Sequence, residues 1–152
     1  MSRERGVAWY ALLRQVRPLV LNSARVVEAS LSSQGLTVGM RAVLEVLVES
    51  GDSTVPAIAA RLQIARQGVQ RHVDDLRARG YVGVRANPAH RRSVLVAATG
   101  PGAEAMRRIR EDELSALSAL APGCTREDIE VAVRVVSALN DEIRQLAAGG
   151  RP

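Results

Sequence analysis

Aromatic residues are scarce in this 152-residue chain, which has no Phe, one Trp and two Tyr. Its apolar residues make up 47% of the chain and are nearly all Ala, Val and Leu. That share is typical of a globular protein and argues against a disordered one. Because β-sandwiches normally contain more aromatic side chains, the composition favours a mainly helical fold built from small residues.

Cysteine and long apolar runs are also scarce. The single Cys124 excludes an internal disulfide framework and fits a reducing cytoplasm, and we expect it to be inert rather than redox-active. No stretch approaches the ~18 uncharged apolar residues of a membrane span. Arg14 and Arg17 interrupt the N-terminal region, so we expect no signal peptide. The sequence therefore predicts one cytoplasmic domain without a membrane partner.

Lysine is absent, and all 21 basic residues are Arg. The net charge is +5, and its position is informative: residues 66–92 contain seven Arg and two acidic residues, whereas the positive and negative charges of the remaining chain cancel. An excess confined to one segment favours a polyanionic partner, with nucleic acid ahead of membrane. A solvated charged face is the alternative.

Helical spacing of apolar residues predicts a first helix over residues 7–31, which Pro18 should kink or split. Thr37 is a good N-cap for a second helix, Val38–Glu49, in which four residues should face inward: Val43, Leu44, Leu47 and Val48.

Two further helical segments, Val55–Leu62 and Arg66–Arg79, are separated by a short turn. Two Val-rich runs of strand length follow, Tyr81–Arg85 and Ser93–Ala98, and a basic loop over residues 86–92 joins them. This order predicts a helix-turn-helix followed by a β wing.

The C-terminal third predicts two more helices. The first runs from the Thr99-Gly-Pro-Gly segment to about Leu120, and the second begins at the capping-box residues Thr125 and Asp128. The last helix has a long apolar seam, which a small central unit cannot cover and which predicts a partner subunit: Ile129, Val133, Val136, Leu139, Ile143 and Leu146.

The second helix of the pair has two chemically different faces. We expect its apolar residues to be buried with those of the preceding turn, namely Leu62, Ile64, Val69, Val73 and Leu76. The other face offers Arg, which suits guanine O6 and N7, and Gln, which suits adenine N6 and N7. The candidate DNA-reading residues are Arg66, Gln67, Gln70 and Arg71.

The basic loop of the wing contains His90, Arg91 and Arg92, and Asn87-Pro88 supplies turn chemistry. An Arg at the tip of a two-stranded wing can enter the minor groove, where narrow A·T tracts concentrate negative potential.

With these segments in place, the sequence resembles the MarR family of bacterial transcriptional regulators over nearly its whole length. The specific motifs are residues 62–82, residues 87–93 and residues 98–102. The resemblance implies a recognition helix containing Arg66, Gln67, Gln70 and Arg71, and a wing whose tip Arg is Arg92. It also implies a homodimer that occupies a palindromic operator and, in many members, is released by a phenolic or other aromatic ligand.

The family's ligand pocket lies between the dimerisation helices and the DNA-binding lobe. Its weak candidates here are Trp9, Tyr10, Met40, Arg41 and Leu44.

The chain departs from the family pattern at three positions. Ala65 stands where a Ser or Thr usually caps the recognition helix, Gly68 replaces a hydroxyl residue, and His90 replaces the Asp that would orient the wing Arg. These departures weaken the expectation of normal operator affinity more than the expectation of the fold.

The predicted fold is mainly α with a two- or three-stranded β wing, as one domain over residues 1–152. Its DNA-binding lobe covers about residues 36–99, and its dimerisation helices cover about 5–32 and 101–148. We expect a ligand-responsive repressor; the alternative is a dimeric ligand- or protein-binding module without sequence-specific DNA binding. No catalytic motif is present and no cofactor is expected. His72, His90 and Cys124 lack zinc-ligand spacing.

Overall fold

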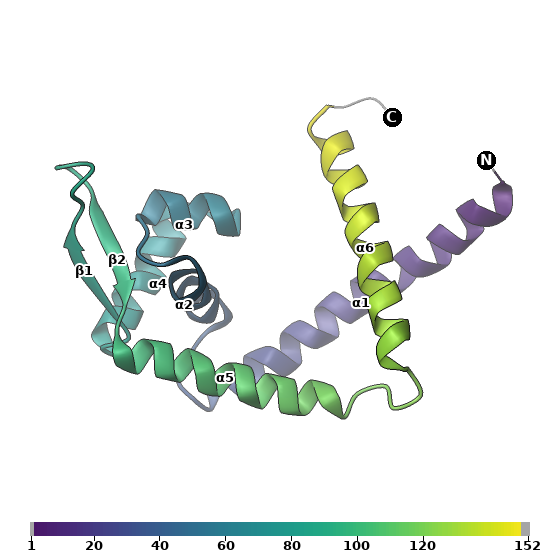
Figure 1. Cartoon of the computed structure of the whole chain (residues 1–152), viewed down its shortest axis with the longest axis horizontal. Helices are drawn as coiled ribbons and strands as arrows, with labels where there is room; N and C mark the ends of the chain where they lie inside the picture. Colours follow the sequence, from purple (N-terminus) through teal and green to yellow (C-terminus); the bar gives the residue numbers. More distant parts are fainter. Residues whose placement is uncertain (1, 150–152) are drawn as a thin grey trace. The chain divides into compact units, whose positions relative to one another are not determined.

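The computed structural model describes residues 2–149, which form six helices and one two-stranded sheet (Figure 1). The elements follow the order α1 (Arg3–Ser32), α2 (Val38–Ser50), α3 (Val55–Leu62), α4 (Arg66–Ala78), β1 (Val82–Ala86), β2 (Val94–Ala98), α5 (Gly100–Ser118) and α6 (Arg126–Ala147). The chain divides between Arg110 and Glu111 into two compact units. The prediction of a mainly α fold with a small β wing is confirmed.

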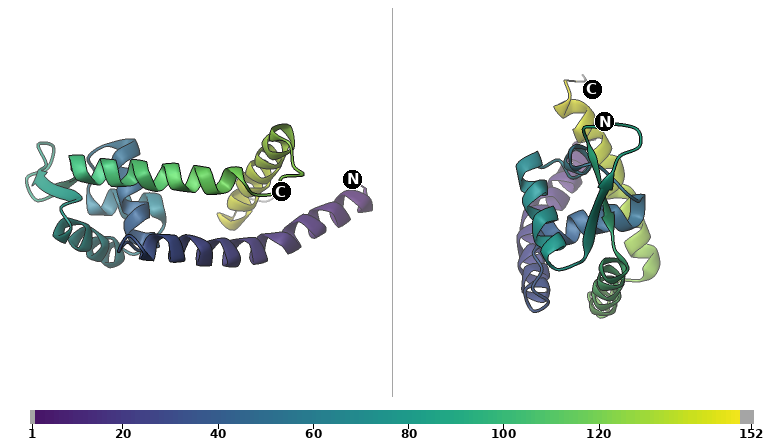
Figure 2. Two further views of the ribbon diagram at one scale, coloured as in Figure 1. Left: turned by 90° about the horizontal axis from the view of Figure 1, so that it is seen from below. Right: turned by 90° about the vertical axis from the view of Figure 1, so that its left-hand side faces the viewer.

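Helix α1 is a single 30-residue helix that continues through Pro18. Figure 2 shows it as one curved, unbroken rod, so a split at Pro18 does not occur. A proline inside a helix removes one backbone hydrogen bond, and the helix bends locally rather than ending. Near its C-terminal end Leu31 is buried in the core of the first unit, which anchors the helix there.

The start and end of helix α2 follow from its sequence. The Thr37 hydroxyl caps the helix by accepting a 3.2 Å hydrogen bond from the Met40 amide, as predicted. The helix ends at Gly51, whose φ of 79° lies in the region that favours glycine.

Helix α3 forms the helix-turn-helix with α4. Thr54 caps α3 by accepting from the Ala57 amide at 3.3 Å, and Pro56 occupies its first turn at little cost. Gln63 then adopts a left-handed conformation with φ 55°, which ends α3 and begins the short turn to α4.

Strands β1 and β2 pair antiparallel, with Val84 opposite Val96. Ser53 adds an isolated bridge to Val96 through two backbone hydrogen bonds of 3.0 and 2.8 Å. The hairpin therefore has two full strands and one residue in the place of a third. Figure 1 shows α2, α3 and α4 gathered against this hairpin.

Helix α5 begins in close contact with the segment that precedes β1. The Gly102 amide donates to the Thr99 hydroxyl at 3.1 Å, and that hydroxyl donates to the Gly80 carbonyl at 2.6 Å. A Cβ on Gly102 would lie 2.0 Å from the Tyr81 carbonyl oxygen, so only glycine allows this approach. Further along α5, Arg110 donates to Glu45 and Glu49 of α2 at 3.2 and 2.7 Å, which raises its guanidinium pKa.

The buried core of the first unit takes residues from α1 to α5, including Val69, Val73 and Leu76 of α4, as predicted. Two predictions of burial are wrong. Val48 is 40% exposed and Ile64 is 41% exposed. Val48 follows the buried Leu47 and so lies at the edge of the buried face of α2. Ile64 lies in the turn after α3, where no neighbouring helix covers it.

The second unit consists of the C-terminal part of α5 and helix α6. The Thr125 hydroxyl accepts from the Asp128 amide at 3.2 Å, and the Thr125 amide donates to the Asp128 carboxylate at 2.8 Å, so the predicted capping box is present. The Thr125 hydroxyl also donates to the Asp128 carboxylate at 2.7 Å, and this bond, together with the one from the Thr125 amide, lowers the pKa of Asp128. No residue of α6 is buried, and its apolar seam is open to solvent within the single chain.

Between residues 2 and 149, no helix combines the length and the apolar character needed to cross a membrane.

Candidate nucleic-acid interface

The core contacts of α4 fix which of its side chains reach solvent. Val69, Val73 and Leu76 face inward, so a helix of 3.6 residues per turn turns Gln67 and Arg71 to the opposite side. Arg66 lies in the first turn, and Gln70 lies on the flank next to the hairpin. All four predicted DNA-reading side chains of this helix are exposed.

The first turn of α4 has no side-chain cap, because Ala65 has the backbone geometry of an N-cap without a side-chain acceptor. It also has no acidic residue. Amides at a helix N-terminus that no side chain satisfies form a ready site for an anion such as a phosphate. The structure therefore confirms that α4 lacks a side-chain cap at Ala65, as the sequence indicated. This uncapped first turn includes Arg66.

The loop between β1 and β2 is held by Asn87. Its side-chain amide donates to the Ser93 hydroxyl at 2.8 Å, and its side-chain oxygen accepts from the Ala89 amide at 3.0 Å. These two bonds close the loop at its base. His90, Arg91 and Arg92 lie beyond the bonds on the loop and are exposed.

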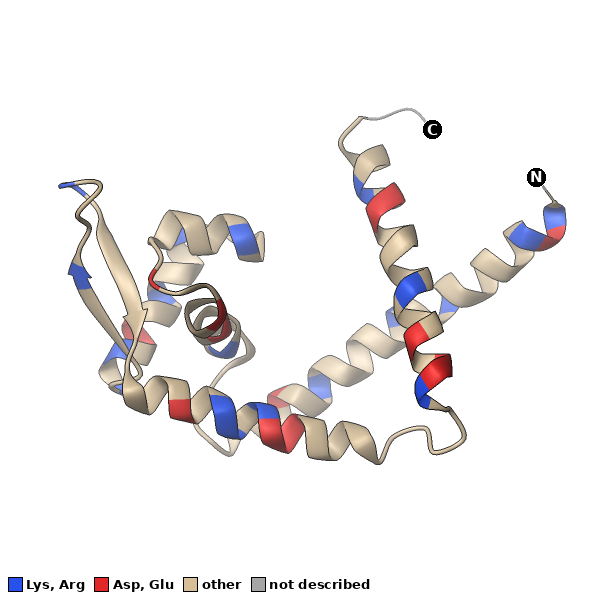
Figure 3. Ribbon diagram, viewed as in Figure 1, with Lys and Arg blue, Asp and Glu red and all other residues tan. Residues whose placement is uncertain are grey.

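Basic side chains differ in pairing across the first unit. Ion pairs with glutamates are formed by four of them: Arg41, Arg107, Arg108 and Arg110. At the base of the hairpin, Arg85 pairs with Asp52 at 2.6 Å. Among the described residues, none of the basic side chains in the predicted DNA-reading set has an acidic partner: Arg66, Arg71, Arg91 and Arg92. Figure 3 shows basic positions on α4 and at the hairpin tip. These side chains can accept phosphate or base contacts without first losing an ion pair.

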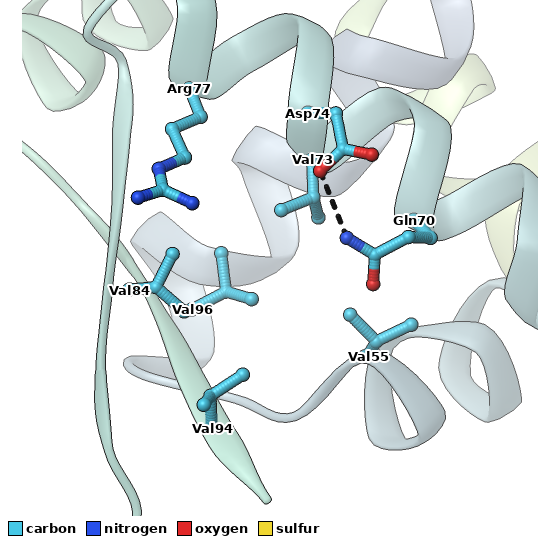
Figure 4. Close-up of a pocket in the computed structure, with 8 residues that line it drawn as sticks. All are labelled: Val55, Gln70, Val73, Asp74, Arg77, Val84, Val94 and Val96. Atoms are coloured by element: carbon cyan, nitrogen blue, oxygen red, sulfur yellow. Dashed lines mark hydrogen bonds between the residues drawn. The ribbon is translucent and has the colours of Figure 1, made fainter.

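A groove of about 310 Å³ separates α4 from the hairpin (Figure 4). Four Val side chains from α3, β1 and β2 line it, together with Val73, and three polar residues of α4 stand at its rim: Gln70, Asp74 and Arg77. The Gln70 amide nitrogen donates to the Asp74 carboxylate at 3.0 Å. The sequence reading missed this pair, although its spacing of four residues on a helix is the signal that identifies it.

His72 is half-buried and packs against α2, since a Cβ on Gly39 would lie 2.1 Å from its Nε2. Cys124 is exposed in the turn before α6.

The weak ligand-pocket candidates do not come together within one chain. Met40 and Leu44 are 2% and 0% exposed and fill the lobe core, and Arg41 pairs with Glu45 at 2.9 Å. Trp9 and Tyr10 belong to α1, about 33 Å along that helix from its buried Leu31 at 1.5 Å per residue. The pocket therefore stays a prediction.

Comparison with known proteins agrees with this architecture. The family model of the MarR family matches residues 34–93. The crystal structure of the MarR family transcription regulator SP03579 is 30% identical, with a TM-score of 0.86, and the match covers 95% of this chain and 96% of that one. Streptococcus pneumoniae FabT, solved in complex with DNA, has the same fold with a TM-score of 0.76 at 16% identity, over 91% of this chain and 99% of FabT.

A curated relative, the uncharacterized protein Rv2011c of Mycobacterium tuberculosis, is 45% identical over 58 residues, or 38% of this chain. The chain covers 41% of that protein's length. The near-complete match to SP03579, together with the helix-turn-helix and wing described above, establishes that this chain belongs to the MarR family of transcription regulators.

Proposed function

We propose that this protein is a homodimeric repressor that binds a pseudo-palindromic operator and is released by a small phenolic or other aromatic ligand. The observation that carries the proposal is a set of exposed basic side chains that have no acidic partner among residues 2–149, on two adjacent elements: Arg66 and Arg71 on α4, and Arg91 and Arg92 on the hairpin loop. Gln67 and Gln70 add amides that can bond base edges. Family membership and the DNA complex of FabT support the choice of duplex DNA as the partner.

In this proposal α4 enters the major groove, and the hairpin loop reaches the adjacent minor groove. Arg71 and Gln67 point away from the core and would meet base edges, whereas the uncapped N-terminus of α4 would receive a phosphate. Arg92 would read the narrow minor groove, with Arg91 and His90 near phosphates.

The dimer in this proposal forms through the terminal helices, residues 5–32 and 101–148, and leaves residues 36–99 as the DNA-binding lobe. The apolar side chains of α6 support it, because Ile129, Val133 and Val136 are all about half exposed in the single chain and need a partner surface. Two lobes related by a twofold axis read half-sites about one helical turn, ~10 bp, apart.

A ligand would act by favouring a lobe spacing that cannot match both half-sites. The ligand pocket would need the partner subunit's helices, since Trp9 and Tyr10 lie far along α1 from the lobe core of their own chain. Catalysis has no part in this proposal.

The test is a titration of fluorescent duplex DNA from the intergenic region upstream of the gene. We expect Arg71→Ala and Arg92→Ala to weaken binding about 5- to 100-fold each, the range for a specific base contact. Arg134→Ala is the matched control, because it removes the same charge from the face of α6 opposite the apolar seam. Affinity should fall steeply with salt.

Undiminished binding by both variants would refute the residue assignment. Equal affinity of the wild-type protein for the promoter and for a random duplex would instead favour a ligand- or protein-binding module that does not read sequence.

A further inference from the structure

Asp74 is an acidic residue on a helix face that is otherwise suited to DNA. It follows Gln70 by one helical turn and is exposed. No basic side chain pairs with it among residues 2–149, and its described partner is the side-chain amide of Gln70. A carboxylate near DNA phosphates repels them and so lowers the affinity for DNA. The presence of Asp74 on this face therefore needs a compensating gain in recognition.

The gain is a fixed orientation of the Gln70 amide. The Gln70 Nε2 donates to Asp74 Oδ1 at 3.0 Å, and Figure 4 shows the amide oxygen pointing away from Asp74. Rotating the amide by half a turn would place its oxygen against the carboxylate, and two acceptors would then face each other without a proton between them. The ionised Asp74 therefore allows one of the two amide orientations.

We propose that Asp74 is a positioning residue that holds the Gln70 carbonyl oxygen free for the DNA and thereby makes Gln70 select one kind of base. This inference rests on the proposed function. A fixed acceptor at Gln70 bonds a base that offers an amino group in the major groove, which is N6 of adenine or N4 of cytosine. Guanine O6 and thymine O4 are acceptors and are rejected at that position.

The expected size of the base preference follows from the binding free energy of one side-chain–base contact. A well-formed side-chain–base pair discriminates by about 5- to 100-fold against the wrong base. An amide free to rotate would meet either kind of base edge and would discriminate little. Removing Asp74 should therefore flatten the preference at one position in each half-site without removing Gln70.

The experiment begins with selection of bound sequences from random duplexes by the wild-type protein. Each position of the selected site is then replaced by each base, and binding is measured by fluorescence anisotropy at one salt concentration. The variants are Asp74→Ala, Asp74→Asn and Gln70→Ala. Asp75→Ala is the matched control, because it removes an adjacent carboxylate that makes no described bond to Gln70.

We expect the wild-type protein to prefer adenine or cytosine at one half-site position, and Asp74→Ala and Gln70→Ala to reduce that preference to about twofold or less. Asp74→Asn should reduce the preference as well, because an Asn amide can donate to Gln70 as well as accept from it and so permits both orientations of the Gln70 amide. All three aspartate variants should bind DNA more tightly in general, since each removes a negative charge from the interface. Thermal melts of each variant verify folding.

Two outcomes would overturn the inference. In one, Asp74→Ala keeps the full base preference, which would mean that the pair with Gln70 only stabilises the helix. In the other, Asp75→Ala flattens the same position as strongly, which would mean that general charge sets the preference. If the wild-type protein selects no sequence at all, the proposed function itself fails, and this result is distinct from both.

Discussion

Gly102→Ala tests whether the close approach of α5 to the segment before β1 sets the stability of the lobe. The added Cβ would lie 2.0 Å from the Tyr81 carbonyl oxygen and 2.9 Å from its carbonyl carbon. A comfortable C···O contact needs about 3.3 Å, so backbone must move by roughly 1.3 Å. Both sides of the contact are backbone, and no side chain can rotate to relieve it.

The cost can be worked from the contacts at the site. Overpacking of a tight site costs about 1–3 kcal/mol. The movement also strains the Thr99 hydrogen bonds, in which its amide donates to the Tyr81 carbonyl at 3.0 Å and its hydroxyl accepts from the Gly102 amide at 3.1 Å. Losing one of these adds about 1 kcal/mol. The total of about 2–4 kcal/mol lowers Tm by roughly 5–15 °C in a chain of this length.

The assay is thermal unfolding followed by circular dichroism at one fixed protein concentration, because the proposed dimer would make Tm depend on concentration. Gly68→Ala is the matched control: Gly68 also lies in a helix, but apart from its chain neighbours and the nearby backbone of its own helix nothing lies within 4 Å of its added Cβ. It should raise stability by up to about 1 kcal/mol, the helix propensity gain of Ala over Gly. A Gly102→Ala protein as stable as the wild type would refute the steric reasoning.

Three other predictions concern caps, charge and assembly. Ala65→Ser should add about 1 kcal/mol of stability, measured by urea denaturation, because α4 then gains a side-chain cap; an unchanged midpoint would contradict this. Hydrogen bonds from Arg107 and Arg108 lower the pKa of Glu104 from 4.5 to about 2. Because the pKa of Glu104 is lower in the folded state, its ion pairs stabilise the fold above pH 4.5, and this stabilisation is lost as the pH falls towards 2. The Tm difference between wild type and Glu104→Gln should therefore vanish in acid. Val136→Asp should convert the proposed dimer to monomer in sedimentation velocity, and a dimer retained at micromolar concentration would exclude the α6 seam as the interface.

Local sequence signals predicted most helix boundaries, because a few adjacent residues decide them. Thr37 and Thr125 cap α2 and α6 as expected, and the absence of a cap at Ala65 could also be read from the sequence. The spacing of Val69 and Val73 identified the buried face of α4, since one apolar stripe on an otherwise polar helix has only one way to be buried.

Features that depend on tertiary packing could not be predicted in the same way. In α2 apolar residues cover more than one face, so periodicity did not show that Val48 would be exposed while Met40 was buried. The ion pairs of Arg110 with Glu45 and Glu49 join residues more than 60 positions apart. No local pattern specifies such a contact, because it exists only after α5 has packed on the lobe.

The candidate site shows how far the sequence can be followed. The exposed set on α4 was predictable, because it is the complement of the buried stripe. The orientation of Gln70 was not, because the residue type offers both a donor and an acceptor, and only its bond to Asp74 distinguishes them.

Helix α4 is poorly stabilised by its own sequence, and this is consistent with its place in the site. It lacks an N-cap at Ala65, contains Gly68 and has Arg66 where the helix dipole disfavours a cation, which together cost about 2–3 kcal/mol relative to a well-capped helix. Burial of Val69 offsets much of this, since removing such a side chain from water contributes about 1.5–3 kcal/mol. The core thus holds the helix in place while its first turn keeps open amides, open space and an unpaired cation. A DNA phosphate bound there would satisfy the amides and neutralise Arg66, so the features that weaken the free helix are the ones that an anionic partner would reverse.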